Sequence, residues 1–392
     1  MLRRRRVGRG SRIASSGRVR RSGLGRIGCL PLLLVALLGT LGFGGAVRTQ
    51  CLAPLDEAPA GGAPTGGGQT PFGDAALQES VRTEDSTYLT FPEWYIVYSA
   101  QEYASALASD PPSGYPYFRS AGQYWCSYNT VFEWSRRRYP FSAGNHLMLL
   151  VIGTSYTAEY AIKGVYENTL GRVTEWLSDG GDTEEDRFNA QLWRDYGAFL
   201  EHTPWYRFPF GSKLAGLWSE TSAWGSYPIR KWERKLALSA EYAVKASYGG
   251  LIGLATGAVY TAYEERTLTW MEQVPPDVLA QVSGARVERQ VDASTQLVAL
   301  PRFREFDKAV VGLARRGARF REFAGNDEIM LTAIAPTSWS STGLDGQLLF
   351  EQPILIDPAS KRVAINVPVQ SLHRVLAALE EQGVRLEHLY DY

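Results

Sequence analysis

A motif that occurs twice constrains the fold of this chain more than any other feature. Residues 158–174 read AEYAIKGVYENTLGRVT and residues 240–256 read AEYAVKASYGGLIGLAT, with eight of the seventeen positions identical. On a helix, the glutamate, the lysine and the second tyrosine of each copy fall on one face. The repeat therefore predicts two equivalent helices, each with a Glu–Lys–Tyr stripe beside an apolar run.

Two interpretations of these stripes follow from their charges. The members are Glu159, Lys163 and Tyr166 in the first copy, and Glu241, Lys245 and Tyr248 in the second. A glutamate four residues before a lysine is the favourable order for an ion pair along a helix, so each copy could carry one solvated pair. Alternatively, the stripes face each other inside the helical domain and form a four-charge network. Such a network could transfer protons or bind a polar ligand head.

Catalytic candidates, should the protein be an enzyme, are the two Glu–Lys pairs and two histidines. His146 lies on the helix predicted for the first copy, and His202 directly precedes an aromatic loop. The Glu-x-x-His spacing of di-iron bundles is absent from the sequence, so no metal is predicted. The sequence also lacks the common hydrolase, zinc-protease and nucleotide-binding motifs. We therefore predict no cofactor, and we favour a protein that is not an enzyme.

An aromatic loop and the two stripe tyrosines are the candidate ligand contacts. The loop, PWYRFPF at 204–210, contributes Trp205, Tyr206 and Phe208, and the stripes contribute Tyr166 and Tyr248. Tyrosine and tryptophan have an apolar body and a polar tip, which suits the head-group level of a bilayer. An aromatic-lined pocket and a core of stacked rings are the alternatives.

The N-terminal segment predicts a membrane anchor. Residues 1–26 contain ten arginines, and the run Ile27–Val47 then has 21 residues without a charge. At about 1.5 Å per residue, a helix of this length spans roughly the 30 Å of a hydrocarbon core. The arginines place the N-terminus in the cytoplasm, with a bacterial inner membrane as the predicted location. A cleaved secretory signal and an organellar transit peptide are the alternatives.

Composition divides the rest of the chain. Residues 48–84 are a Pro/Gly-rich linker, whose part 53–80 is expected to be a flexible tether. Residues 85–263 form an aromatic-rich domain with 19 of the 21 tyrosines, and helices are expected at 92–109, 119–136, 143–177, 184–201 and 228–263. Two more uncharged runs, 139–158 and 246–263, are expected to be buried or partly inserted helices. The second run is also a candidate second membrane segment.

The C-terminal part shows strand patterns. After a connector at 264–284, residues 285–392 predict strands near 295–301, 318–324, 328–335, 348–356, 362–369 and 384–392, with helices at 303–317 and 371–383. This order suggests a small ferredoxin-like α+β sandwich, and the predicted fold class is mainly α with an α+β C-terminal domain. His373 and His388 are expected at its surface. A Cys51–Cys126 disulfide is compatible with the sequence.

Charge excludes one class of function. Beyond residue 55, 30 basic residues stand against 41 acidic ones, whereas nucleic-acid binding requires a basic face. The sequence thus predicts a membrane-anchored protein whose aromatic helical domain engages lipid or a membrane protein partner, with a C-terminal interaction module. A membrane-associated enzyme that acts on an apolar substrate is the first alternative. An accessory subunit of a transport system is the second.

Overall fold

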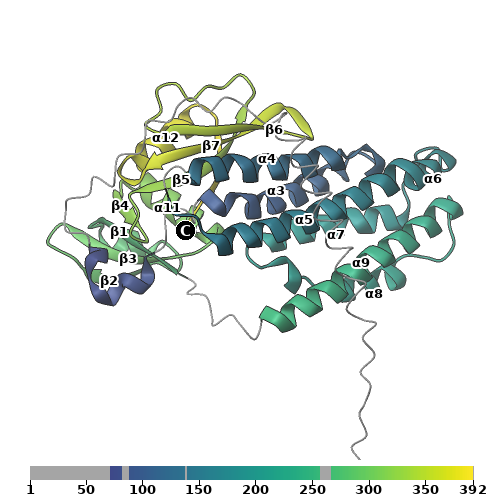
Figure 1. Ribbon diagram of the computed structural model, residues 1–392, viewed down its shortest axis with the longest axis horizontal. Coiled ribbons are helices and arrows are strands. Elements are labelled where there is room, and N and C mark those ends of the chain that lie inside the picture. Colours follow the sequence, from purple (N-terminus) through teal and green to yellow (C-terminus); the bar gives the residue numbers. More distant parts are fainter. Residues whose placement is uncertain (1–70, 82–87, 137–138, 257–265, 392) are drawn as a thin grey trace, which may run out of the picture.

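A helical region and a sheet region make up the protein, and they pack side by side (Figure 1). The computed structural model describes residues 71–81, 88–136, 139–256 and 266–391. The chain is mainly helical, with antiparallel sheets towards its C-terminal end. The predicted anchor Ile27–Val47, the basic segment before it and most of the predicted linker lie outside the described residues.

The helical region confirms a helix at each of the five expected places, the last of them as far as the described residue 256, and it adds α8, which was not predicted. Its helices are α3 (Phe91–Ala106), α4 (Tyr117–Ser135), α5 (Ala143–Tyr166), α6 (Arg172–Leu177), α7 (Glu184–Leu200), α8 (Phe210–Glu220) and α9 (Pro228–Thr256). A π-helical turn, Glu167–Gly171, joins α5 to α6 without a break. The start of α7 is fixed by a capping box, in which the Thr183 and Asp186 side chains each accept a hydrogen bond from the other's backbone N–H.

The tyrosines and tryptophans of this region mainly form its core. The ring of Tyr103 lies 4.8 Å from that of Tyr115 and 4.8 Å from that of Trp193, both edge to face. Buried hydroxyls find partners, as in the 3.0 Å contact between the Tyr103 and Tyr117 hydroxyls. Of the three interpretations of the aromatic composition, the stacked core is therefore the one that describes most of these residues.

Two four-stranded antiparallel sheets form the C-terminal part. The strands are β1 (Arg266–Glu272), β2 (Arg286–Gln290), β3 (Thr295–Pro301), β4 (Phe320–Phe323), β5 (Glu328–Pro336), β6 (Gln347–Ile354), β7 (Asp357–Pro368) and β8 (Arg385–Leu389). Their orders are β2-β3-β1-β4 and β6-β7-β5-β8. Helix α11 (Arg304–Arg315) and helix α12 (Leu372–Glu381) share one apolar core with both sheets, and a short helix α10 (Pro276–Ala280) follows β1.

Strand β1 corrects the expectation that residues 264–284 are a connector. It pairs with both β3 and β4 in the middle of the first sheet. Its inward positions are Thr267, Thr269 and Met271, all buried. Threonine at two of these three positions hides the apolar alternation that normally announces a strand. The single sandwich expected at 285–392 is likewise replaced by two sheets, the first of which begins before residue 285.

The end of the predicted tether is packed rather than free. Residues 71–80 form two short 3₁₀ helices, Pro71–Gly73 and Ala75–Ser80. Phe72 is buried, and Asp74 forms an ion pair of 2.8 Å with Arg289 on β2. Gly325, which follows β4, leaves room for these residues, because a Cβ atom there would lie 3.2 Å from Val81. The buried side chain of Phe72, within a Pro/Gly-rich stretch, thus fixes this segment to the first sheet.

A buried polar contact joins the second sheet to α3. Arg362 on β7 is 2 % exposed and bonds Glu387 on β8 at 2.6 Å and Glu102 on α3 at 3.2 Å. His388 was expected at the surface, but it is fully buried, with Nδ1 2.9 Å from the carboxylate of Asp307. Cys126 on α4 is disulfide-bonded, whereas Cys51, the partner that the sequence allows, lies outside the described residues.

Candidate functional site

The two copies of the repeat meet through reciprocal ion pairs. Lys163 Nζ on α5 lies 2.8 Å from Glu241 Oε1 on α9, and Lys245 Nζ on α9 lies 2.8 Å from Glu159 Oε1 on α5. Each lysine thus pairs with the glutamate of the opposite copy, as equivalent positions do across a local two-fold axis. Within the first copy, Lys163 also lies 3.3 Å from Glu159. The stripes therefore face each other.

Aromatic rings surround the two ammonium groups of this four-charge network. Lys163 Nζ lies 4.1 Å from the ring centre of Trp193 and 5.0 Å from that of Tyr103. Lys245 Nζ lies 5.1 Å from the ring centre of the same Trp193. A desolvated cation over an aromatic face gains electrostatic energy, so Trp193 stabilises both lysines. The lysine side chains are only 11 % and 10 % exposed.

The electrostatics of the network favour the charged form of Glu159. Burial alone raises the pKa of Glu159, but the ammonium groups of Lys245 and Lys163 outweigh that effect and lower the pKa well below its usual range. Lys163 and Glu241 are close without an aligned hydrogen bond, so their attraction is mainly Coulombic. Because each of the four charges has an opposite charge beside it, the network as a whole is neutral.

A second ionic cluster, missed in the sequence, lies at the start of α9. The segment RKWERK at 230–235 is a basic cluster in the sequence, yet Arg234 is only 1 % exposed. Its guanidinium contacts Glu167 at 2.8 Å and Glu233 at 2.6 Å. Glu167 opens the π-helical turn, and Gly171 closes it with no side chain that would collide with the Glu167 carboxylate. The π turn thus positions Glu167 towards α9.

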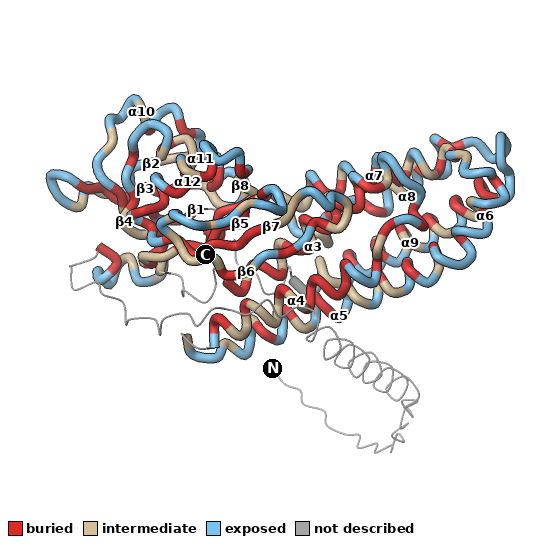
Figure 2. The backbone as a smooth tube through the Cα atoms, turned by 90° about the horizontal axis from the view of Figure 1, so that it is seen from above, coloured by how far each residue is buried: buried red, intermediate tan, exposed pale blue. Residues whose placement is uncertain are grey.

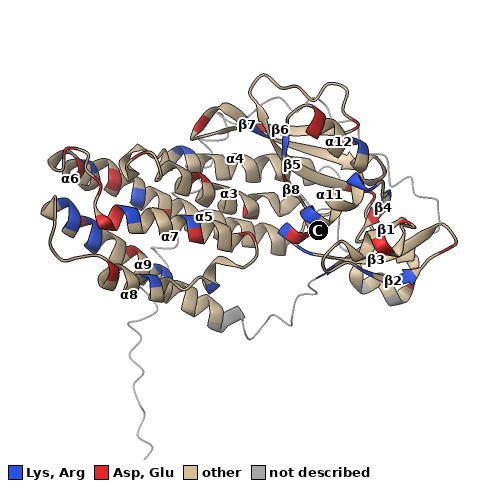
Figure 3. Cartoon of the chain, turned by 180° about the vertical axis from the view of Figure 1, so that it is seen from behind, with Lys and Arg blue, Asp and Glu red and all other residues tan. Residues whose placement is uncertain are grey.

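The capped end of α7 supplies the remaining acids of this cluster. Lys231 lies 2.8 Å from Glu184 and 3.1 Å from Glu185, and Lys235 lies 3.4 Å from Glu185. Arg230 lies 3.4 Å from an oxygen of Asp186. Figure 3 shows these basic residues on the first turns of α9, next to α6. The acids favoured by the N-terminus of α7 therefore have a second role, because they neutralise the lysines of α9.

The charged side chains of α9 point inward, whereas four of its aliphatic side chains point outward. The seven charged side chains of this helix are each at most 19 % exposed. In contrast, Ile229, Leu236, Val244 and Leu251 are 61 %, 59 %, 68 % and 64 % exposed. A helix on the surface of a water-soluble protein normally shows the opposite arrangement.

Helices α5 and α6 continue this outward apolar surface. Their exposed apolar residues include Leu147, Val151, Ile162, Val165, Val173 and Trp176, which recur at helical spacing along one side. The only two charged residues of α5, Glu159 and Lys163, belong to the network with α9. Ile162 and Val244 hold the same place in the two copies of the repeat and are 71 % and 68 % exposed. We call this combined surface of α5, α6 and α9 the outer face.

Most other predicted site residues lie away from the four-charge network. His146 is buried among Tyr128 and Phe141 near the start of α5, more than three helical turns from Glu159. His202 is half-exposed in the turn after α7, 3.9 Å from Glu201. His146 is therefore too far along α5 to join the four-charge network.

The aromatic candidates fall into two places. The hydroxyl of Tyr166 donates a hydrogen bond to Glu233 in the second cluster. Tyr248 stacks on Trp205 with ring centres 5.4 Å apart. Tyr206 is half-buried, and Phe208 is buried against α7, with its ring 5.0 Å from that of Tyr196. The loop thus closes the aromatic core at this point instead of projecting all of its rings outward.

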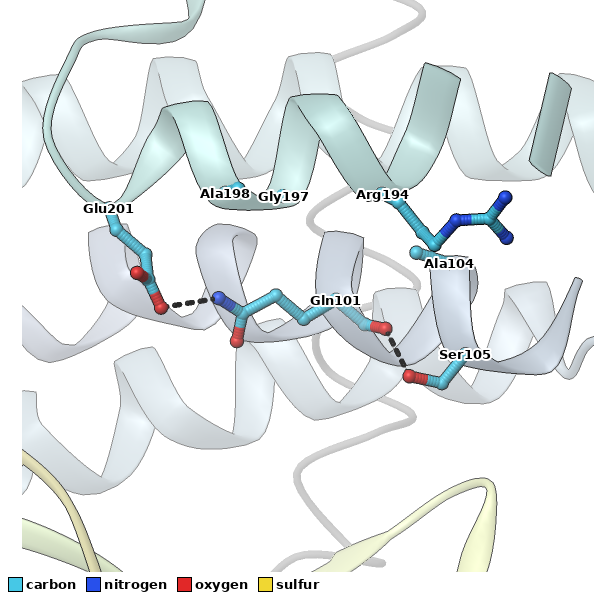
Figure 4. A pocket seen from close by; sticks show the side chains of 7 residues that line it. All are labelled: Gln101, Ala104, Ser105, Arg194, Gly197, Ala198 and Glu201. Carbon is cyan, nitrogen blue, oxygen red and sulfur yellow. Dashed lines mark hydrogen bonds between the residues drawn. The ribbon is translucent and has the colours of Figure 1, made fainter. Parts of the chain in front are cut away.

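Grooves on the helical region lie elsewhere. One, of 270 Å³, runs between α3 and α7 and is lined in part by Gln101, Arg194 and Glu201 (Figure 4). The amide of Gln101 donates to Glu201 at 2.9 Å across it. The other, of 320 Å³, lies between α7 and α8. Neither groove is lined by Glu159 or Glu241, so the network does not border either of these spaces.

Comparisons with protein-family models, with curated proteins and with solved structures find no match to this chain. Within the described ranges, no helix combines the length and the apolar character needed to cross a bilayer, and this applies to both 139–158 and the part of 246–263 that α9 covers. Among those same residues, no group of three or more His, Cys, Asp or Glu side chains could hold a metal ion.

Proposed function

We propose that this is a membrane protein whose outer face, on α5, α6 and α9, contacts lipid. The observation that carries the proposal is the inverted arrangement of α9, with paired charges inside and exposed aliphatic side chains outside. In lipid surroundings, charged side chains face the protein interior and pair with one another, whereas aliphatic side chains face the hydrocarbon. Large exposed apolar patches of soluble monomers mark the same kind of contact.

The energy at stake is sufficient to hold the region on a bilayer. Full burial of a valine, leucine or isoleucine side chain stabilises by about 1.5–3 kcal/mol. Ile229, Leu236, Val244 and Leu251 are each 59–68 % exposed, so each would gain roughly 1–2 kcal/mol on leaving water. Together these four residues of α9 contribute on the order of 4–8 kcal/mol before the cost of association. The residues of α5 and α6 add to this sum.

The anchor predicted at Ile27–Val47 belongs to the same proposal. It would hold the chain at a bacterial inner membrane with a cytoplasmic N-terminus, and the outer face would then meet a surface that is already close. Tethering of this kind raises the effective concentration of the second contact. The sequence analysis also allows a membrane protein partner with an apolar surface to cover the outer face. The crosslinking experiment below distinguishes such a partner from lipid.

The C-terminal part fits an interaction module. We infer two ferredoxin-like units in tandem, because each sheet places its second, third, first and fourth strands side by side, and α11 and α12 precede the fourth strands. In the second unit, a loop at 337–346 replaces the first helix. This fold serves many functions and argues for none in particular.

An enzymatic role for Glu159 and Glu241 receives less support than a structural one. Each carboxylate lies 2.8 Å from a lysine of the opposite helix. The lysines lower the pKa of Glu159 well below neutral pH, which does not suit a general acid or base that works near pH 7. We therefore assign the network to holding α5 against α9.

Photo-crosslinking at single positions tests the proposal. A diazirine amino acid would replace Ile162 or Val244 in the full chain, in its native membrane, and Val287 on β2 would serve as the matched control because it is also an exposed valine (44 %). We expect phospholipid adducts at 162 and 244 and not at 287, detected by mass spectrometry. Adducts with water alone at 162 and 244 would refute lipid contact, and adducts with another protein would favour the partner.

A further inference from the structure

We infer that α5–α6 and α9 lie along the membrane plane in one leaflet, with the helical region resting on the bilayer rather than crossing it. This inference depends on the lipid contact proposed above and adds its geometry. It predicts which residues share one depth in the bilayer, and it predicts that α7 faces water.

The length of the outer face is the first observation. Its exposed apolar residues on the continuous α5–α6 helix run from Leu147 to Trp176. At about 1.5 Å per residue, these 29 steps cover roughly 44 Å, against a hydrocarbon core of roughly 30 Å. Fitting that length across the core would require a tilt of about 47°, beyond the range of about 0–40° seen for membrane helices. A position within the membrane plane has no such length limit.

The charged surface of α7 is the second observation, and it is independent of length. Figure 2 shows α7 and α5 on opposite sides of the helical region, and Arg187 and Arg194 of α7 are exposed. Asp195 and Lys213 form a further pair there, 38 % and 29 % exposed. If the region crossed the bilayer, these charges would face hydrocarbon, where charged side chains are costly and rare. In the in-plane position they face water while the outer face meets lipid.

Exposed aromatic residues at the far end of the helical region fit the same position. Trp176 at the end of α6 is 78 % exposed, and Trp224 in the turn before α9 is 76 % exposed. Tyr227, next to Trp224, is 41 % exposed and covers Gly181. Tryptophan and tyrosine favour the head-group level. At the tip of helices that lie flat, these residues would mark the depth at which α6 ends and α9 begins.

Spin-label depth measurements on the full chain in phosphatidylcholine–phosphatidylglycerol vesicles test this inference. Labels would be attached through a ketone amino acid at Leu147, Val173, Ile229 and Leu251, which leaves the cysteines intact, with Arg194 as the control. Depth is obtained from the ratio of collisions with oxygen and with a water-soluble nickel complex. We expect the four outer-face labels to lie at one depth, within about 5 Å of each other, and the label at 194 to be as accessible to nickel as in water.

Three other results are distinguishable. Depths that change steadily from 147 to 173 and pass through the bilayer centre, with label 194 also shielded from nickel, would show a crossing orientation and overturn this inference while leaving lipid contact intact. Nickel access at all four sites would overturn both the inference and the proposed function. Labels that neither oxygen nor the nickel complex reaches, with dipolar broadening between molecules, would show a second copy on the outer face. That result would also overturn both the inference and the proposed function.

Discussion

Replacement of Arg234 by methionine is the sharpest test of the buried ionic cluster. The guanidinium is 1 % exposed and lies 2.8 Å from Glu167 and 2.6 Å from Glu233. Removal of one partner from a buried pair costs about 3–5 kcal/mol, because the other partner stays buried without its countercharge. Glu233 keeps Thr174 and Arg230 as partners, so most of the penalty falls on Glu167. At about 2–4 °C per kcal/mol, the melting temperature should fall by roughly 10 °C.

Lys213→Met is the matched control for this prediction. Lys213 pairs with Asp195 at 2.7 Å, but these side chains are 29 % and 38 % exposed. Exposed pairs contribute about 0–1 kcal/mol, so this variant should melt within about 3 °C of the parent protein. Thermal denaturation followed by circular dichroism measures both variants. Equal losses in Arg234→Met and Lys213→Met would refute the view that the charges of α9 are desolvated.

The pH dependence of Arg234→Met gives a second readout. Burial raises the pKa of Glu167, and the charge of Arg234 opposes that rise. Without Arg234 the pKa of Glu167 rises further, so the folded state binds a proton that the unfolded state releases near neutral pH. Stability then increases as the pH falls towards the unfolded pKa. The deficit of Arg234→Met should therefore shrink between pH 8 and pH 5, and the added change Glu167→Gln should remove most of that pH dependence.

Three further predictions concern single positions. Burial raises the pKa of Glu93 on α3 to about 7, so the protein loses stability as the pH rises from the ordinary pKa of a glutamate through 7. Glu93→Gln should therefore raise the melting temperature at pH 8 but not at pH 4. Equal effects at both pH values would contradict this. Gly171→Ala should destabilise by about 1–3 kcal/mol in denaturant titrations, because the new methyl group meets the Glu167 carboxylate, whereas Gly144→Ala, with open space around it, should be neutral or stabilising. Cys51→Ser should abolish the mobility shift of the oxidised chain in non-reducing gels, since Cys126 is disulfide-bonded; an unchanged shift would exclude Cys51 as its partner.

The repeat was the most informative feature of the sequence for the site. Its spacing predicted both helices, and the alternative in which the stripes face each other matches the 2.8 Å contacts between Lys163 and Glu241 and between Lys245 and Glu159. The sequence likewise predicted a helix at 184–201, which α7 confirms. These features could be predicted because they depend on the spacing of residues that are close together in the sequence.

Features that depend on distant contacts could not be predicted in this way. The sequence alone does not show that the basic segment at 230–235 is buried, because its acidic partners come from α7 and from the π turn. One signal was available, since four aliphatic residues of α9, Ile229, Leu236, Val244 and Leu251, recur seven or eight residues apart. Strand β1 was missed because Thr267 and Thr269 fill inward positions, and His388 was placed at the surface because its partner Asp307 is 81 residues away.

The most direct test of the account asks whether both copies of the repeat present the same side to lipid. A bimane probe attached at Ile162 or at Val244 of the full chain would be measured in ordinary vesicles and in vesicles of brominated phospholipid, with the probe at Val287 as the reference. We predict strong quenching by bromine at both repeat positions and little at 287. Quenching at 162 and 244 that is no greater than at 287 would contradict the claim that the outer face lies in lipid.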